Sequence, residues 1–258
     1  MIFNRHKRMI RRMGFISDQK GILFRYYNEK QQWQSHIDHC REFIIQNAGN
    51  KKKGSVAVLG SGWLLDVPAE YLTETFKDVY FFDICHPAAV RNRFKKTPHV
   101  HFIELDITGG AIQSCYDAYR SFRKKNQKIA VEDLKILGFR SDISFDYVIS
   151  LNILNQLDIL VLDYLLPSKI YTNDELNRLR EIIQRTHIES LPAGKSILIT
   201  DHEEIWTNAA GQAIGSKNLI YTVLDPSKIS SRWQWFFDSH FNYYRNKNVV
   251  FNVTAMVL

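Results

Sequence analysis

The stretch SVAVLGSGWLLDVPAEYLTETFKDVYFFD, residues 55–83, decides the fold of this chain. It contains two short apolar runs, 56–59 and 79–82, and both have the composition of strands that are buried on both faces. The glycine turn Gly60-Ser61-Gly62 follows the first run directly. Because glycine has no Cβ, such a turn allows backbone N–H groups to approach a bound ligand closely.

A helix is predicted over residues 68–76, because Pro68 suits a first helical turn and Leu72 and Phe76 lie on one face. The second strand then ends on an acid, Asp83. The order strand, glycine turn, helix, strand and acid is typical of a nucleotide-binding α/β unit, in which the acid accepts hydrogen bonds from ribose hydroxyls. The stretch therefore predicts an α/β sheet with a nucleotide site at its carboxyl edge.

From Gly54 to Leu258 the sequence resembles the class I S-adenosylmethionine-dependent methyltransferases. Residues 56–62 stand where that family has its first motif, Asp83 where it has the acid that closes the second strand, and residues 105–107 where it has the side chains beside the adenine. The resemblance implies S-adenosylmethionine as the cofactor. The residues that it implies for cofactor binding are Gly60, Ser61, Gly62, Asp83, Asp106 and Ile107.

The first motif departs from the family pattern at two positions. Val58 stands where the family has an acid, and Leu64 stands where it often has a third glycine. In the family, the missing acid contacts the amino group of the methionine part of the cofactor. Asp66 either supplies a carboxylate nearby or occupies the first turn of the next helix, where the helix dipole favours an acid.

Length and composition limit the possible architectures. A chain of 258 residues fits one α/β domain with an added segment, and the absence of an eighteen-residue apolar run predicts no membrane span. The three cysteines are widely spaced and odd in number, which predicts no metal cluster, no disulfide framework and a cytoplasmic location. We divide the chain into a basic N-terminal helical extension, residues 1–53, and a Rossmann-like methyltransferase domain, residues 54–258.

The excess of positive charge lies in the extension, which carries 12 Lys and Arg against 4 acids. Residues 1–15 form a basic arm. This arm is either solvated or frayed, or it contacts nucleic acid or another anionic surface. The basic side chains of this arm are Arg5, Lys7, Arg8, Arg11 and Arg12. Residues 50–54, with three lysines, are predicted to be a linker.

Apolar residues at three- and four-residue steps predict one helix over residues 21–47. His36 and His39 on this helix form either a metal pair or two surface histidines. The second interpretation is favoured, because we find no acid or cysteine partner for them at ligand spacing.

Polar side chains follow two of the remaining predicted strands, 145–151 and 196–200. Carboxamides at Asn152, Asn155 and Gln156 are expected at the carboxyl end of a central strand, where open α/β sheets bind ligands. Asn152 either orients the acceptor or cofactor, or caps the following helix. Residues 150–153 read Ser-Leu-Asn-Ile, which excludes the Asp/Asn-Pro-Pro-aromatic motif of methyltransferases that act on adenine or glutamine.

The next strand delivers Asp201 and His202 to the same edge. We predict His202 as a general base with Asp201 beside it, because a histidine pKa lies near neutrality and a carboxylate can hold one tautomer. The alternative is that both residues cap a helix beginning at Glu203. Trp206 and the helix and loop over 206–228 are expected to cover the acceptor.

The end of the chain completes the predicted architecture. Residues 172–191 form a helix opened by a capping box, Thr172 with Glu175, and residues 233–237 and 249–258 form an antiparallel pair, an ending that methyltransferases share. The predicted fold is a single doubly wound, mostly parallel sheet with a C-terminal antiparallel hairpin and an N-terminal helical extension.

Three functions fit these residues. The first is a methyltransferase that acts on the oxygen or nitrogen of a small polar acceptor, with S-adenosylmethionine as methyl donor. The second is a non-catalytic binding protein of the same fold, which Val58 and Leu64 suggest. The third is an NAD(P)-binding oxidoreductase, which shares the two-glycine turn but would need a third glycine at Leu65.

Overall fold

The computed structural model describes residues 2–49 and 53–258, with side chains described from residue 6. One sheet has the strand order β3-β2-β1-β4-β5-β8-β7, and β6 pairs with β5 beside this path. The strands are β1 (Ser55–Leu59), β2 (Asp78–Asp83), β3 (Val100–Glu104), β4 (Tyr147–Leu151), β5 (Ser196–Thr207), β6 (Ala213–Asn218), β7 (Ile229–Asp238) and β8 (Asn248–Val257).

The first five strands pair in parallel, in the order typical of a doubly wound nucleotide-binding sheet. β8 then runs antiparallel to both β5 and β7. The prediction of a mostly parallel sheet with a C-terminal antiparallel hairpin is therefore confirmed.

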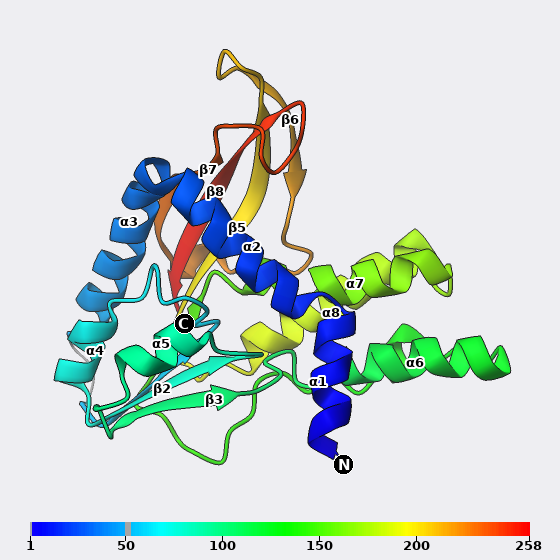
Figure 1. Cartoon of the computed structure of the whole chain (residues 1–258), viewed down its shortest axis with the longest axis horizontal. Helices are drawn as coiled ribbons and strands as arrows, with labels where there is room; N and C mark the ends of the chain where they lie inside the picture. Colours follow the sequence, from blue (N-terminus) through cyan, green and yellow to red (C-terminus); the bar gives the residue numbers. More distant parts are fainter. Residues whose placement is uncertain (1, 50–52) are drawn as a thin grey trace.

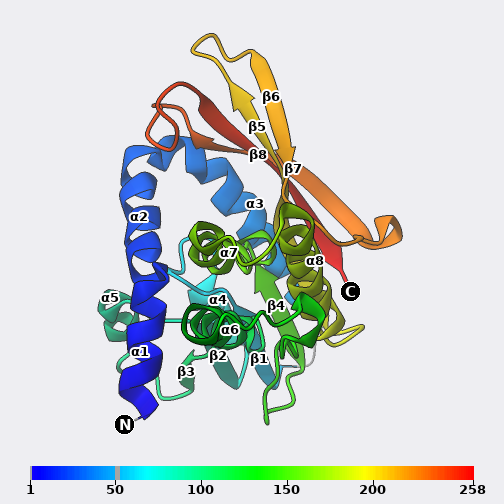
Figure 2. The ribbon, with the colours of Figure 1, turned by 90° about the vertical axis from the view of Figure 1, so that its right-hand side faces the viewer.

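Two hydrophobic cores lie on opposite faces of this sheet. Because side chains alternate along a strand, Ala57 and Leu59 of β1 enter one core, and Val56 and Val58 enter the other. Helices α3, α4 and α5 pack on the second face, and α1, α6, α7 and α8 pack on the first (Figures 1 and 2). These helices are α1 (Ile2–Arg12), α3 (Lys30–Ala48), α4 (Ala69–Thr75), α5 (Ala88–Arg93), α6 (Ala111–Lys125), α7 (Ile159–Leu165) and α8 (Asn173–Glu189).

The N-terminal segment is more closely packed than its sequence suggests. The predicted helix over 21–47 is interrupted at Glu29, which separates α2 (Phe15–Asn28) from α3. Three apolar side chains of the basic arm, Met9, Ile10 and Met13, are buried. The prediction that this arm is solvated or frayed is therefore wrong, although its basic side chains at 7, 8, 11 and 12 are exposed.

Some predictions for the extension stay untested. The side chain of Arg5 and residues 50–52 of the linker lie outside the described residues. The division at residues 53 and 54 stays a prediction, as does binding of nucleic acid or an anionic surface by the arm. Among the described helices, none has the length and apolar character needed to cross a membrane.

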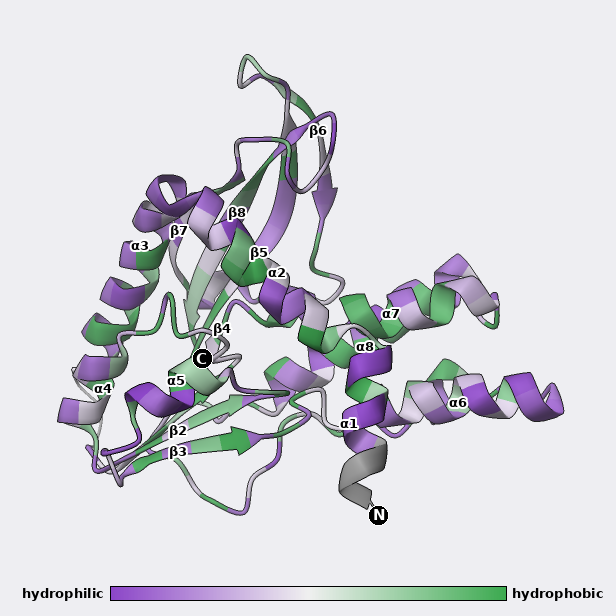
Figure 3. Cartoon of the chain, in the orientation of Figure 1, coloured by the Kyte–Doolittle hydropathy of each residue, from purple (hydrophilic) through white to green (hydrophobic). Residues whose placement is uncertain are grey.

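The largest departure from the predicted elements is β5. It continues through residue 207, so the expected helix beginning at Glu203 is wrong, and residues 206–228 contain β6 and a short 3-10 turn in place of the expected helix. β5, β6 and β8 extend beyond the helices, and hydrophilic residues cover much of β6 (Figures 1 and 3). The capping box at the start of α8 is confirmed, with Thr172 and Glu175 as its members.

Candidate functional site

A cavity of about 260 Å³ opens at the carboxyl edge of the parallel strands. Because parallel strands end at one edge, side chains that are distant in sequence meet there. The predicted site residues that line this cavity are Gly60, Ser61, Gly62, Asp83, Asp106, Ile107, Asn152, Asn155, Gln156 and Asp201. The structure thus brings together every predicted cofactor residue and all of the predicted carboxamides.

The glycine turn has backbone geometry that a side chain would disturb. Gly60 has a φ of 81°, and a Cβ there would lie 2.9 Å from the carbonyl oxygen of Leu151. The third-glycine position, Leu64, also has a positive φ of 57°, although its side chain is buried in the core. Such a backbone costs a non-glycine residue on the order of 1–2 kcal/mol. Burial of the leucine side chain offsets this cost by a similar amount.

Two acids line the part of the cavity next to this turn. The carboxylate of Asp83 accepts a hydrogen bond from the backbone N–H of Gly62 at 2.8 Å, and burial raises the pKa of Asp83 to about 6. Asp106 accepts from the backbone N–H of Thr108 at 3.0 Å, and burial raises its pKa too. Both carboxylates are held in place for a polar ligand that crosses the ends of β1, β2 and β3.

Asp66 lies in the loop before α4 and lines the cavity, so its placement in a helical first turn is wrong. Its carboxylate accepts a hydrogen bond from Nδ2 of Asn152 at 2.7 Å, and burial raises the pKa of Asp66. Asn152 has a φ of 47° and makes no side-chain cap to the 3-10 turn that follows, so the capping alternative is wrong as well. Both side chains belong to the cavity wall.

His36 is buried at 2% exposure, so its interpretation as a surface histidine is wrong; His39 is exposed as expected. The sequence did contain one clue to a partner of His36, namely Cys40, which follows one helical turn later. In the structure, ligand atoms of His36, Cys40 and Asp66 lie within 4.8 Å of one another. Trp233 Nε1 donates to His36 Nδ1 at 3.0 Å.

Two donors approach the imidazole. An indole N–H can only donate, so Nδ1 of His36 accepts from Trp233, and the amide Nδ2 of Asn152 lies 3.1 Å from Nε2. Burial lowers the pKa of His36 to about 3, which keeps the ring neutral. Both ring nitrogens of His36 already have a hydrogen-bonding partner within the protein, so proximity alone does not make these three residues a metal site.

The side chains of Asp201 and His202, at the end of the parallel part of β5, point to opposite sides of the strand. Asp201 is 2% exposed and lines the cavity, and Asn155 Nδ2 donates to its Oδ2 at 3.1 Å. His202 is outside the cavity, because neighbouring side chains on a strand point to opposite faces, and its Nδ1 contacts Thr254 Oγ1 at 2.9 Å. The prediction of His202 as the general base is therefore corrected.

Trp206 is also placed away from the cavity. Its Nε1 donates to Glu204 Oε1 at 2.6 Å, and the ammonium of Lys247 lies 3.2 Å from its ring centroid. Both contacts follow from the continuation of β5, which carries Trp206 away from the sheet edge. The predicted role of Trp206 in covering the acceptor is wrong.

Sequence reasoning missed the wall that α2 contributes. The cavity side of this helix is lined at helical spacing by Phe15, Asp18, Gln19, Ile22 and Arg25. Gln19 holds the helix over the glycine turn: its side chain donates to the carbonyl of Cys85 at 2.8 Å, and its own carbonyl accepts from the indole of Trp63 at 2.7 Å. The spacing of three or four residues between them is the feature of the sequence from which this wall could have been predicted.

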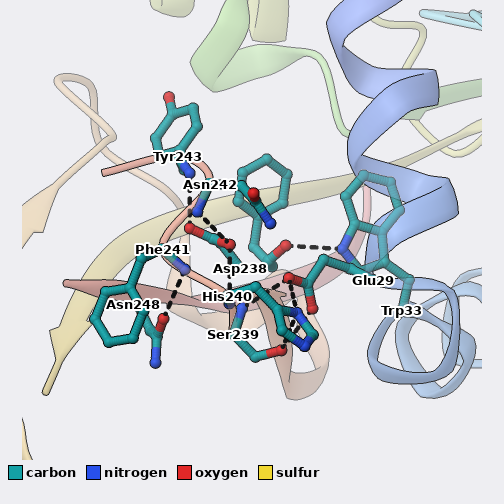
Figure 4. A network of polar contacts seen from close by, with 10 residues as sticks. Glu29, Trp33, Asp238, Ser239, His240, Phe241, Asn242, Tyr243 and Asn248 are labelled. Carbon is teal, nitrogen blue, oxygen red and sulfur yellow. Dashed lines mark hydrogen bonds and ion pairs between the residues drawn. The ribbon is translucent and has the colours of Figure 1, made fainter. Parts of the chain in front are cut away.

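An aromatic wall closes the other side of the cavity, built from Trp33 of α3 and from Trp235, Phe237 and Phe251 of β7 and β8. Trp33 stacks on Phe237 with centroids 5.3 Å apart, and its indole N–H donates to the carbonyl of Phe237 at 2.9 Å (Figure 4). Trp33 thus links the N-terminal helices to the end of the sheet.

The corner latch, formed by Glu29, Ser239 and His240, holds the same two segments together (Figure 4). The Glu29 carboxylate is almost fully buried and accepts from the backbone N–H of Ser239 at 3.0 Å and from its hydroxyl at 2.6 Å. Nδ1 of His240 lies 2.7 Å from Oε1 of Glu29. The latch fixes the α2–α3 corner against the loop that follows β7.

The latch predicts a pH dependence of stability. Its hydrogen bond to Glu29 raises the pKa of His240 above the ordinary value of 6.5. Since folding raises this pKa, the stabilisation is fully present below about pH 6.5 and is lost as the pH rises through the folded value. We expect His240→Gln to lower the melting temperature at pH 5.5 and to have a smaller effect at pH 8.5.

Thermal unfolding at both pH values checks this expectation. His39→Gln is the matched control, because His39 is an exposed histidine of α3 whose ring contacts the backbone of Ser35 and no carboxylate. An effect of His240→Gln that is equal at both pH values would contradict the prediction.

No protein-family model matches the chain, and no curated protein matches it significantly. Solved structures do match. The N-methyltransferase NodS from Bradyrhizobium japonicum, in complex with S-adenosyl-L-homocysteine, is 9% identical, with 86% of each chain covered and a TM-score of 0.39. The 1,6-didemethyltoxoflavin-N1-methyltransferase of Burkholderia thailandensis is 10% identical, with 93% of this chain and 87% of that chain covered and a TM-score of 0.41.

The 23S rRNA methyltransferase ErmE is 9% identical, with 86% of this chain and 67% of that chain covered and a TM-score of 0.32.

Proposed function

We propose that this chain is a class I S-adenosylmethionine-dependent methyltransferase that acts on a nitrogen or oxygen of a small polar acceptor. One observation carries the proposal: a single cavity joins the glycine turn and Asp83 to Asn155 and Asp201. A nucleotide cofactor held at the ends of β1 and β2 would therefore share the cavity with an acceptor held at the ends of β4 and β5.

The residues present fit this cofactor. The turn at Gly60 packs too closely against Leu151 and Ile153 to admit a side chain, Asp83 suits the ribose hydroxyls, and Asp106 with Ile107 suits the adenine. Asp66 supplies the carboxylate that Val58 does not, since it lines the cavity beside Asn152. When bound, S-adenosylmethionine supplies an electrophilic methyl group, and the protein contributes mainly position and one base.

Asp201 is the residue that we propose as the base, in place of His202. Its Oδ1 has no hydrogen-bond partner, and its Oδ2 is held by Asn155. Burial raises the pKa of Asp201 to about 7, close to the value at which a general base works best near neutral pH.

The cofactor assignment predicts the effect of replacing Asp83. We expect Asp83→Ala to weaken the binding of S-adenosylhomocysteine by about 1 to 3 kcal/mol, because charge-assisted hydrogen bonds to the ribose are lost. Isothermal titration calorimetry measures the change. Asp78→Ala is the matched control: this acid lies at the other end of β2, where it pairs with His101 outside the cavity.

Two outcomes separate the alternatives. If neither S-adenosylmethionine nor its demethylated product binds and a nicotinamide nucleotide does, the oxidoreductase alternative replaces this proposal. If the cofactor binds and no methyl group is ever transferred, the chain is the non-catalytic binding protein.

A further inference from the structure

The part of the cavity next to α2, β4 and β5 is acidic within a basic protein. The chain has a formal net charge of +7, yet the side chains of Asp18, Asp66 and Asp201 line this part. Among the described residues that line the cavity, Arg25 is the one with a permanent positive charge. A ligand that is cationic or rich in hydrogen-bond donors suits this surrounding better than an anion.

Asn155 and Asp201 each have a buried side-chain oxygen that lacks a hydrogen bond, as does Asn152. Oδ1 of Asn155 and Oδ1 of Asp201 have no partner, although the two residues are 5% and 2% exposed. The Asn155 amide is oriented by its own Nδ2, which donates to Oδ2 of Asp201, so its free atom is an acceptor. Buried acceptors without partners are costly, and both residues line the cavity. They call for N–H or O–H donors from a ligand.

The aromatic wall adds an apolar surface to the same space. Trp33 and Trp235 meet edge to face with centroids 4.8 Å apart, and Phe237 lies 4.9 Å from Trp235 and 4.8 Å from Phe251. Rings of this kind pack against flat apolar groups, and their faces attract cations. A ligand with an apolar body and a cationic end fits both the wall and the carboxylates.

We propose that the methyl acceptor is the amine nitrogen of a small molecule with an apolar, ring-sized body. This inference rests on the proposed function and names the substrate class of the same site. The bound ammonium gives one proton to Asp201. The resulting amine nitrogen forms a bond to the methyl carbon of S-adenosylmethionine, the carbon–sulfur bond breaks, and its electron pair stays on sulfur. The products are the methylated ammonium and S-adenosylhomocysteine.

Arg25 argues for the rival ligand, a carboxylate. Its guanidinium lies 5.5 Å from the ring centroids of both Phe237 and Tyr243 and 4.0 Å from Oδ1 of Asp18, although its Nε is buried without a hydrogen-bond partner. A carboxylate beside Arg25 would also face the repulsion of the nearby acids. The free acceptors of Asn155 and Asp201 would remain without donors.

The test uses the full chain loaded with S-adenosylhomocysteine and three probes with the same ring: 2-phenylethylamine, 2-phenylethanol and 3-phenylpropionate. Calorimetry is expected to show binding of the amine at least about tenfold tighter than that of the alcohol or the acid, the value of one charge-assisted hydrogen bond. Equal affinities for the three probes, undetectable binding of all three included, would overturn the proposal. Tighter binding of the acid or alcohol would overturn it too.

Two variants test whether the preference for the amine arises from Asp201 in the cavity. Asp201→Asn keeps the shape of the side chain and removes its charge, so the amine should lose about tenfold in affinity while S-adenosylhomocysteine binds as before. Asp225→Asn is the control. Asp225 is an exposed acid that accepts a hydrogen bond from the backbone N–H of Ser227, and asparagine can accept the same bond, so both affinities should stay unchanged. Binding of S-adenosylhomocysteine is measured first: if it fails, the proposed function itself fails, whereas binding of it without amine preference removes only the substrate class.

Discussion

Asp201→Asn is expected to lower the rate of methyl transfer to an amine by about 10²- to 10⁴-fold, the usual range for loss of a general base. The affinity for S-adenosylhomocysteine should stay nearly unchanged, because the cradle of Gly60 and Asp83 is intact. Burial, with a smaller contribution from the carboxylate of Asp66, raises the pKa of Asp201 to about 7. A base must be deprotonated to act, so kcat/KM of the unmodified protein should rise with pH through this range.

The pH profile distinguishes a base from a structural residue. In Asp201→Asn the limb that rises near neutral pH should disappear, whereas Glu203→Gln should keep it. Glu203 is the matched control, because it is an acid of the same strand that bonds Asn252 outside the cavity. A variant at 201 with unchanged rate, or with an equal loss of cofactor binding, would refute the assignment of Asp201 as base.

Trp33→Ala is expected to lower the free energy of unfolding by about 3–5 kcal/mol, the range for truncating a buried large aromatic side chain. The indole is 2% exposed, packs between Trp235 and Phe237, and donates the hydrogen bond that satisfies the carbonyl of Phe237. Removing it leaves a cavity and an unpaired buried acceptor. Urea denaturation monitored by circular dichroism measures the change.

Trp206→Ala is the comparison for this experiment. It removes a side chain of the same size from the extended part of β5, where the indole is only partly buried, and it should cost clearly less. A loss of under about 1 kcal/mol for Trp33→Ala would mean that α3 adds little to the stability of the sheet.

Much of the fold could be predicted because its signals are local. The two apolar runs, the turn at Gly60 and the acid at Asp83 lie within one short stretch, and each acts through its own backbone or composition. The cofactor part of the cavity followed from the same logic, since parallel strands share a carboxyl edge. For that reason Asp83, Asp106 and Asn155 meet in one cavity as expected.

The acceptor part could not be predicted in the same way, because it depends on where β5 ends and on packing between distant segments. His202 was expected in the cavity on the assumption that the strand stops at Thr200. The strand instead continues, with a register shift between Asp201 and Glu203, so that Asp201 faces the cavity. Burial of His36 likewise depends on Trp233 and Trp235, which lie almost 200 residues later.

The contacts of Trp33 and Glu29 with β7 also determine when this site can form during synthesis. Their partners, Phe237 and Ser239, emerge from the ribosome 204 and 210 residues later. At a translation rate of about 5–20 residues per second, the apolar sides of α2 and α3 remain uncovered for roughly 10–40 s, until the surface that covers them has been synthesised. The acceptor pocket is therefore completed last, after the nucleotide half has been synthesised. Until then the nascent chain exposes the kind of aromatic surface that chaperones bind.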